Sequence, residues 1–290
     1  MSSVYDAGAR PIIFLHIPKT AGTTVSDILR RQYAAHQIYE DEFDRAEVRA
    51  RFEALPAEEK RRYHLFRGHL PFGFHTYLAR PATYFTFLRH PVDRVLSHYY
   101  YVRSRPDLFG LHDAIVRDRL SLYEIIEQDL IVDISNMQTR YLAGLPHLFP
   151  ANAYTEAHLD SARHNLAAYF GVVGLVEQFD ASLLLLRHAF GWRDCFYVRR
   201  NVTRRPAREA IAPETVTLIE RKEAYDMALY RFAKQLFAAQ RAAYGTSFER
   251  DLARFRLLNR VAYAPLAGMR QWVGRVAVLG RRRRPSPGNG

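Results

Sequence analysis

The stretch that decides the fold is Ile12-Ile13-Phe14-Leu15-His16-Ile17-Pro18-Lys19-Thr20-Ala21-Gly22-Thr23-Thr24. Its first half, residues 12–17, is an almost unbroken β-branched and aromatic run, which predicts a strand buried on both faces of a sheet. A turn over residues 18–22 follows. From Thr23 the apolar residues recur at helical spacing to about Ala34, so Thr23 or Thr24 is expected to cap a helix.

A strand, a tight loop and a helix together form a cradle for phosphate. The loop directs backbone N–H groups at an anion, and the helix N-terminus adds the positive end of its dipole. Lys19 adds a charge beside Ala21 and Gly22, and hydroxyl donors come from Thr20, Thr23 and Thr24. No Walker A string, G-x-x-x-x-G-K-[ST], occurs in the chain. The alternative to a phosphate cradle is an ordinary turn between a strand and a helix, with Lys19 exposed to solvent.

A second strand-turn-helix unit follows at residues 82–103. The apolar run 82–88 predicts a strand, and Pro91 suits the first turn of a helix that runs to about Arg103. Arg89 ends the strand and Ser97 lies eight residues on, about two helical turns, so both can face one ligand phosphate. Arg94 is open to a role as a surface ion-pair partner. An amphipathic helix with a solvated arginine is the alternative for the whole segment.

The remaining pattern predicts an α/β fold with an open, mainly parallel sheet flanked by helices. We expect surface helices within 36–62, a helix over 155–169 capped by Thr155, a strand over 170–175, and helices over 177–190 and 214–239. A short strand over 195–198 should lead into a basic loop. The ligand should lie at the carboxyl edge of the sheet. A main domain over 1–250 and a basic helical tail over 251–290 complete the prediction.

Composition limits the class of protein. With 290 residues, 48% of them hydrophobic, the chain can bury a substantial core. Cys195 is the only cysteine, so it forms no disulfide within the chain and is expected to be a buried packing residue. No apolar run is long enough to span a membrane, and residues 1–10 lack the apolar core of a signal peptide. These features predict a cytoplasmic protein.

The net charge of +12 is concentrated at the end of the chain. From Leu252 onward there are nine arginines and neither lysine nor acid, so the body is not a general polyanion binder. After Pro265 the apolar residues share one face of a helix that includes Trp272. A basic amphipathic helix suits an anionic membrane surface, and packing on the body or on a second subunit is the equal alternative.

The two motifs together resemble one known family. His-Ile-Pro-Lys-Thr-Ala-Gly-Thr-Thr resembles the 5′-phosphosulfate loop of sulfotransferases that use 3′-phosphoadenosine 5′-phosphosulfate (PAPS), in the carbohydrate O-sulfotransferase branch that includes heparan sulfate 2-O-sulfotransferases and bacterial relatives. Phe-Leu-Arg-His-Pro-Val-Asp-Arg-Val-Leu-Ser-His-Tyr-Tyr resembles the 3′-phosphate motif. The resemblance covers roughly residues 11 to 240. It implies a P-loop-like fold, with residues 19–24 on the 5′-phosphosulfate and Arg89 and Ser97 on the 3′-phosphate.

The resemblance also implies a general base. A Gly-His pair at this place in the chain supplies the base in the family, which makes His69 the candidate, and imidazole suits removal of a hydroxyl proton. Lys19 would stabilise charge on the leaving phosphate oxygen. A structural role is the alternative for a protein with 12 histidines, and His64 and His75 are substitutes. Some relatives carry a second histidine where this chain has Arg67.

Two further segments have two interpretations each. The family places a basic loop over the 3′-phosphate, for which the chain offers Arg199, Asn201, Thr203 and Arg204; a solvated turn is the alternative. A segment common in bacterial relatives contains Asn136, Gln138 and Arg140. These side chains are equally suited to reach the ligands or to connect loops.

The function implied is transfer of a sulfuryl group from PAPS to a hydroxyl of a glycan, glycolipid or lipid-linked saccharide, with no metal and no nucleic acid. The sequence is also compatible with a homo-oligomer and with a peripheral contact of the tail with the inner face of the membrane. Animal members are anchored in the Golgi by an N-terminal span, so a cytoplasmic location departs from them. The rivals are a small-molecule kinase, for which a Walker A lysine is missing, and a membrane- or nucleic-acid-binding protein that depends on the tail.

Overall fold

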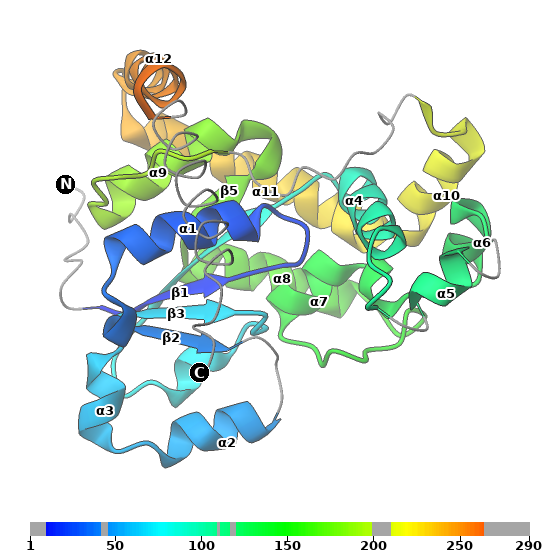
Figure 1. The fold of residues 1–290 in the computed structure, drawn as a ribbon, viewed down its shortest axis with the longest axis horizontal. Helices are drawn as coiled ribbons and strands as arrows, with labels where there is room; N and C mark the ends of the chain where they lie inside the picture. Colours follow the sequence, from blue (N-terminus) through cyan, green and yellow to red (C-terminus); the bar gives the residue numbers. More distant parts are fainter. Residues whose placement is uncertain (1–9, 42–45, 109–110, 117–119, 199–209, 264–290) are drawn as a thin grey trace, which may run out of the picture.

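A computed structural model describes residues 10–41, 46–108, 111–116, 120–198 and 210–263. Its centre is a five-stranded, fully parallel sheet in the order β2-β3-β1-β4-β5 (Figure 1). The strands are β1 (Ile12–Leu15), β2 (Ile38–Asp41), β3 (Leu65–Gly68), β4 (Thr83–Leu88) and β5 (Phe170–Leu175). The predicted α/β class with a P-loop-like parallel sheet is therefore confirmed.

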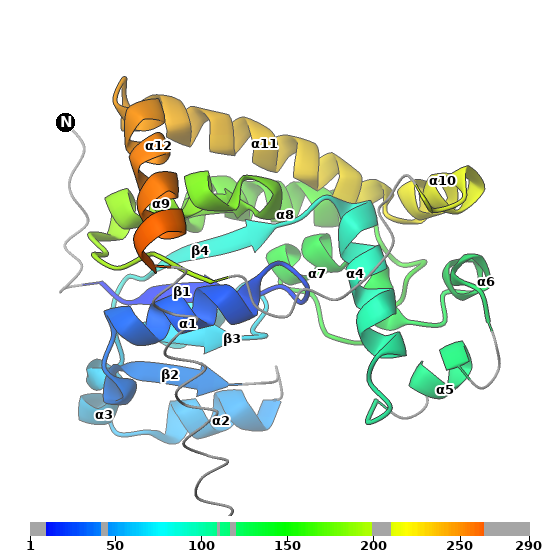
Figure 2. The same ribbon diagram turned by 45° about the horizontal axis from the view of Figure 1, so that its top comes forward.

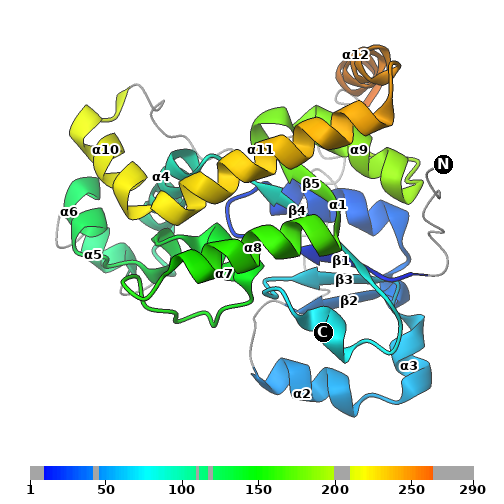
Figure 3. The same cartoon turned by 180° about the vertical axis from the view of Figure 1, so that it is seen from behind.

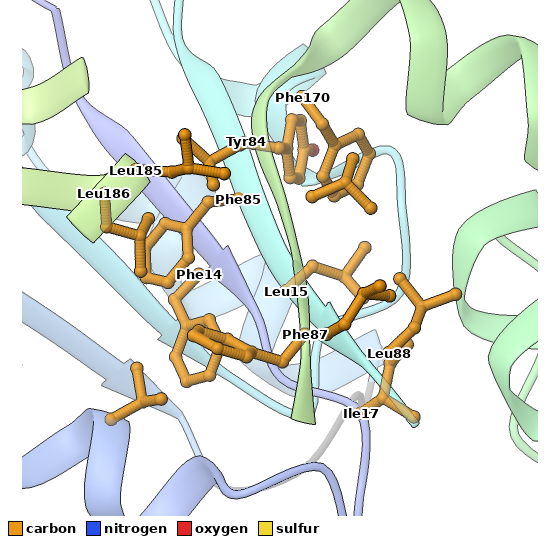
Figure 4. Packing of buried hydrophobic residues seen from close by; sticks show 14 of the residues in the cluster. Phe14, Leu15, Ile17, Tyr84, Phe85, Phe87, Leu88, Phe170, Leu185 and Leu186 are labelled. Atoms are coloured by element: carbon orange, nitrogen blue, oxygen red, sulfur yellow. The ribbon is translucent and has the colours of Figure 1, made fainter. Parts of the chain in front are cut away.

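β1 is the central strand because its side chains are buried on both faces of the sheet. It pairs with β3 on one side and β4 on the other, with Ile12 opposite Leu65 and Thr83. The Phe14 and Phe85 rings stack with centroids 4.7 Å apart. Figure 4 shows how residues of β1, β4, β5 and α9 interlock in this core. The sheet order changes direction at β1, so the carboxyl end of β1 is where a ligand crevice is expected.

Helices cover both faces of the sheet. α1 and α9 lie over one face, while α7 and α8 lie over the other, as Figures 1 and 3 show from opposite sides. The long α11 contacts α8 and β5, and α12 packs on α9. The helices described are α1 (Gly22–Gln32), α2 (Ala46–Ala54), α3 (Ala57–Arg62), α4 (Pro91–Arg103), α5 (Leu111–Val116), α6 (Leu122–Glu127), α7 (Met137–Ala143), α8 (Glu156–Tyr169), α9 (Phe179–Phe190), α10 (Pro213–Lys222), α11 (Ala224–Tyr244) and α12 (Phe248–Leu258).

A second, smaller hydrophobic cluster lies beyond the carboxyl ends of the strands. It joins α4, α6 and α10 through residues such as Val95, Ile125 and Ile219, with Ile115 of α5 at its side. Figure 2 shows this group of helices standing apart from the sheet, with α4 nearest to the end of β4. The cluster holds α4 as one wall of the region in which a ligand is expected.

Several local predictions need correction. Residues 36–62 are not only surface helices, because 38–41 form the edge strand β2. Residues 195–198 do not form a strand. Neither Thr23 nor Thr24 caps α1: the N-cap is Ala21, in the left-handed region with φ of 68°, and no side chain caps this helix. Cys195 is buried, as expected.

The expected domain boundary at residue 250 falls inside α12. Phe248, Leu252 and Phe255 of this helix are buried in the main core, and a turn of π-helix extends it to Tyr263. The predicted helix after Pro265 and the arginines that follow lie outside the described residues. No helix in the described ranges has the length and apolar character needed to cross a membrane.

Candidate active site

A cleft of about 780 Å³ opens at the carboxyl ends of β1 and β3. One wall is the loop after β1 with the first turns of α1, a second is the end of β3, and a third is α4 and the segment after it. Residues on this lining include His16, Lys19, Thr23, Ser26, Arg30, Glu40, Arg67, His69, His98, Tyr101, Asp133, Tyr141 and His147. The cleft therefore brings together the predicted phosphate loop and the predicted base.

The loop after β1 has an unusual backbone. Lys19 and Ala21 both adopt positive φ, 69° and 68°, a conformation that residues with a Cβ adopt rarely. The buried Thr20 between them donates its hydroxyl to the carbonyl of Ile17 at 2.7 Å, which fixes the turn. Thr23 lines the cleft and Thr24 is buried against the core side of α1. The loop thus has the alternating backbone and the uncapped helix start that suit an anion.

Gly22 starts α1, and the His16 ring occupies the space that a side chain at this position would need. A Cβ built there would lie 1.7 Å from Nε2 of His16. The His16 ring stacks on Phe14 and on His69, with centroids 5.3 Å and 4.5 Å away. Burial, and then the charges of His69, Arg67 and Lys19, lower the pKa of His16 well below its usual value. A neutral, packed His16 therefore lies between the His69 ring and the start of α1.

His69 follows the last residue of β3, Gly68, whose φ of 154° favours glycine. Its Nδ1 lies 3.1 Å from the carbonyl oxygen of His16. Because a carbonyl only accepts, Nδ1 carries the proton in this bond, and the lone pair of the neutral ring is on Nε2. The ring therefore has the tautomer that a general base needs.

The two substitute histidines lie elsewhere. His64 and His75 are not on the cleft lining. The backbone N–H of His75 and its Nδ1 contact the Tyr84 hydroxyl at 2.9 and 3.0 Å. Burial lowers the pKa of both histidines, with Arg80 adding to the effect at His64. Arg67, which stands where some relatives carry a second histidine, lines the cleft and forms an ion pair with Glu40.

Lys19 rests on an aromatic ring. Its Nζ lies 3.6 Å from the centroid of Tyr101, which is on the opposite wall of the cleft. Burial, with the nearby charges of Arg89 and Arg105 adding to its effect, lowers the pKa of Lys19 to about 8. An anion in the cradle would replace these unfavourable surroundings with a favourable partner.

The second predicted anion site is joined to the first. Arg89 follows β4 and donates from Nη1 to the carbonyl of Lys19 at 3.1 Å, so it braces the phosphate loop. Ser97 is buried on α4. The backbone just before α4 already has protein partners: Arg89 N–H donates to the Gln138 side chain and His90 N–H donates to the Glu177 carboxylate, at 2.9 and 2.7 Å.

The interpretation of Arg94 as a surface ion-pair partner is wrong. Arg94 is fully buried and donates to the carbonyls of Asp133 and Ile134 at 2.9 and 2.8 Å. It also pairs with the buried Glu223 at 3.4 Å. Burial raises the pKa of Glu223 well above its usual value, and Arg94 opposes this rise. Arg94 therefore holds α4 to the segment before α7.

Asn136, Gln138 and Arg140 connect loops in this structure. Asn136 accepts from the Asp226 N–H at 3.0 Å, and Gln138 donates to the Arg89 carbonyl while accepting from its N–H. Arg140 donates to Asp133 at 3.0 Å. The loop-connecting interpretation is the one that these contacts support.

Four predicted nucleotide contacts, Arg199, Asn201, Thr203 and Arg204, lie outside the described residues.

Within the described ranges, no cluster of three or more His, Cys, Asp or Glu side chains could hold a metal ion. The sequence reasoning assigned no role to His16, His98, Tyr101 or Asp133 on the cleft lining. Their place in the sequence could have identified two of them, since His16 directly precedes the phosphate loop and His98 directly follows Ser97.

Comparison with known proteins shows which ones this chain resembles. The model of the Sulfotransferase family matches residues 4–138. The chain is 26% identical over 270 residues to galactosylceramide sulfotransferase of Mus musculus, which covers 86% of this chain and 62% of that protein. It is 24% identical over 290 residues to heparan sulfate 2-O-sulfotransferase hst-2 of Caenorhabditis elegans, covering 88% and 87%. The predicted resemblance to carbohydrate sulfotransferases is confirmed, with residues 4–138 matching the family model and the relatives 24–26% identical to the chain.

A third relative, galactose-3-O-sulfotransferase 2 of Mus musculus, is 24% identical over 251 residues, covering 79% of this chain. The chain spans 62% of the length of the two mouse relatives. The predicted cytoplasmic location is wrong, because the matching relatives are animal sulfotransferases, the members that the family resemblance assigns to the Golgi.

Proposed function

We propose that the protein transfers a sulfuryl group from PAPS to a hydroxyl of a saccharide acceptor, a glycan or a glycolipid. The observation that carries the proposal is one cleft lined by both Lys19, in a loop suited to an anion, and His69, in the tautomer suited to a base. The names of the relatives, which include a galactosylceramide, a galactose and a heparan sulfate sulfotransferase, support a saccharide acceptor.

The residues present fit a nucleotide with anionic groups at both ends. Residues 19–24 would hold the 5′-phosphosulfate through backbone N–H groups, the α1 dipole and the Lys19 ammonium. Arg89 and Ser97 would hold the 3′-phosphate, with Arg199, Asn201, Thr203 and Arg204 as further candidates. When bound, PAPS supplies the activated sulfuryl group.

His69 would act on the acceptor. Its Nε2 takes the proton of the attacking hydroxyl, while the Nδ1 bond to the His16 carbonyl keeps the ring in position. Lys19 stabilises the negative charge that develops on the phosphate oxygen as the sulfuryl group leaves in line. Because the stacked His16 ring is neutral, it adds no positive charge next to His69.

The test is incorporation of labelled sulfate from PAPS into a panel of galactosylceramide, galactose-terminated oligosaccharides and heparan sulfate. We expect incorporation into at least one acceptor. His69→Ala should reduce turnover by about 10²- to 10⁴-fold while adenosine 3′,5′-bisphosphate still binds. His64→Ala is the matched control, because this histidine is off the cleft and should leave turnover unchanged. Full turnover by His69→Ala would place the base elsewhere.

A further inference from the structure

His98 on α4 is a buried histidine without a hydrogen-bond partner. It follows Ser97 in sequence and lines the cleft, with a side chain that is only 6% exposed. In the part of the chain that the structure describes, neither Nδ1 nor Nε2 of this ring has a hydrogen-bond partner. A buried polar group without a partner destabilises the folded protein, so a role that uses the ring in the ligand complex would explain its presence.

The neighbours of His98 are the predicted donor-binding groups. Tyr101 lies three residues along α4, on the same face of the helix, and carries the Lys19 ammonium on its ring. Burial lowers the pKa of His98 to about 4; Asp133 opposes this shift, and Arg94, Lys19 and Arg140 add to it. The ring is therefore neutral near pH 7, with one N–H to donate.

Lys19 and His98 both line the cleft, and the charge of Lys19 is one of those that lower the pKa of His98. The Lys19 ammonium rests on the ring of Tyr101, which lies three residues after His98 on α4. A bound anion that pairs with the Lys19 ammonium would draw it off the Tyr101 ring. This anion would then lie next to the face of α4 that carries His98. Because Lys19 belongs to the loop assigned to the 5′ end of the nucleotide, that anion is the 5′ group and not the 3′-phosphate.

Resting on the proposed function, we propose that His98 is a donor-binding residue. Its imidazole N–H donates to an oxygen of the 5′-phosphate or phosphosulfate when the Lys19 ammonium leaves the Tyr101 ring for the same group. His98 would then complete a three-sided site with the loop backbone and Lys19. This assigns to α4 a contact at the reacting end of the nucleotide, in addition to the contact predicted for Ser97.

Calorimetric titration of the full chain with two probes tests the proposal. Adenosine 3′,5′-bisphosphate carries the 5′-phosphate, and 3′-AMP lacks it. We expect His98→Leu to weaken the bisphosphate about 10- to 100-fold, the effect of losing a hydrogen bond to a charged group, and to leave 3′-AMP within about twofold. His98→Gln keeps an N–H donor and should weaken the bisphosphate less than His98→Leu does.

Thr139→Val is the matched control. The Thr139 hydroxyl is also buried without a partner among the described residues, but Thr139 is off the cleft lining, so this variant should bind both probes as the parent does. Unchanged bisphosphate binding by a folded His98→Leu, or equal weakening of both probes, would overturn the proposal. If His98→Leu does not fold, the imidazole ¹⁵N signals of the parent decide: they must shift with the bisphosphate and not with 3′-AMP. A parent that binds neither probe would instead refute the proposed function.

Discussion

The two strand-turn-helix units, β1 with α1 and β4 with α4, differ in how their helices begin. No side chain caps α1, and its first residue is a glycine packed against an imidazole. At α4 the preceding backbone N–H groups are already bonded, one to the Gln138 amide and one to the Glu177 carboxylate. Two units that look equivalent in sequence are therefore different in what they offer an anion.

This difference separates two ways to bind phosphate. The β1–α1 unit offers backbone N–H groups and a dipole, which depend on loop conformation. The β4–α4 unit has a carboxylate at its helix start, so it can contribute to an anion site mainly through side chains, such as Arg89, Ser97 and His98. Loss of a charged group in the first unit should therefore weaken ligand binding and turnover, whereas loss of the carboxylate at the α4 start should change stability and leave ligand binding unchanged.

Lys19→Met should have the largest effect. We expect turnover to fall by about 10²- to 10³-fold, the usual result of removing a group that stabilises transition-state charge. The melting temperature should stay equal or rise, since the buried ammonium, with its lowered pKa, opposes folding at neutral pH. Sulfate transfer assays and thermal unfolding measure the two. Unchanged turnover would remove Lys19 from the site.

Gly22→Ala should destabilise the first unit. The new Cβ would lie 1.7 Å from His16 Nε2, so the imidazole must move, at a cost of about 1–3 kcal/mol in the free energy of unfolding. Chemical denaturation measures this loss. In the double variant with His16→Ala the clash is absent, and most of the stability should return. A stable single variant would show that His16 does not fix the start of α1.

The pH dependence of nucleotide binding should follow Lys19. Affinity for adenosine 3′,5′-bisphosphate should fall as pH rises through about 8, because the ammonium in the ligand-free protein loses its proton there. Stability moves the other way: between about pH 8 and the ordinary lysine value of 10.5 the unfolded chain holds more protons, so the contribution of Lys19 to the unfolding free energy rises with pH. The same titration of Lys19→Met, which should lack this fall, is the control.

Glu177→Gln should change stability without changing ligand binding. Glu177 accepts from the His90 N–H and from the Tyr230 hydroxyl, both at 2.7 Å, so loss of its charge should cost about 1 kcal/mol. Glu156→Gln, in the exposed first turn of α8, is the control. Tighter binding of adenosine 3′,5′-bisphosphate by Glu177→Gln would mean that the α4 start does receive an anion, and the contrast between the units would fail.

Removal of residues 264–290 should have the smallest effect. We expect nucleotide affinity and turnover with a soluble saccharide to stay within about twofold, since the lining residues that the structure describes run from Phe14 to His147. The cut belongs after Tyr263, because removal from Leu252 onward would take the buried Leu252 and Phe255 from the core. Complete loss of nucleotide binding would favour a protein that depends on its tail.

The sequence predicts the fold where the apolar pattern is strong. The runs at 12–17, 82–88 and 170–175 are buried strands, and a parallel sheet follows from their alternation with helices. β2 was missed because Ile-Tyr-Glu-Asp at the edge of a sheet is half polar and resembles a surface segment.

Within the site, what the sequence misses depends on contacts between distant residues. A single arginine such as Arg94 on a helix reads as a surface residue, and its partners lie 39 to 129 positions away. The need for glycine at position 22 comes from the His16 ring, which folds back over the helix start. The spacing of neighbouring residues predicts neither the partners of Arg94 nor the contact between Gly22 and His16. The order of the two motifs does predict that Lys19 and Arg89 come together.

The lowered pKa of Lys19 also makes it a chemical handle. At pH 8 about half of its side chains would be neutral amines, against well under 1% for a lysine with an ordinary pKa. The other lysines are Lys60, Lys222 and Lys234, so among the lysines an amine-selective acylating reagent should modify Lys19 first. Protection of that single position by a nucleotide would turn covalent labelling into a direct screen for donor analogues and inhibitors.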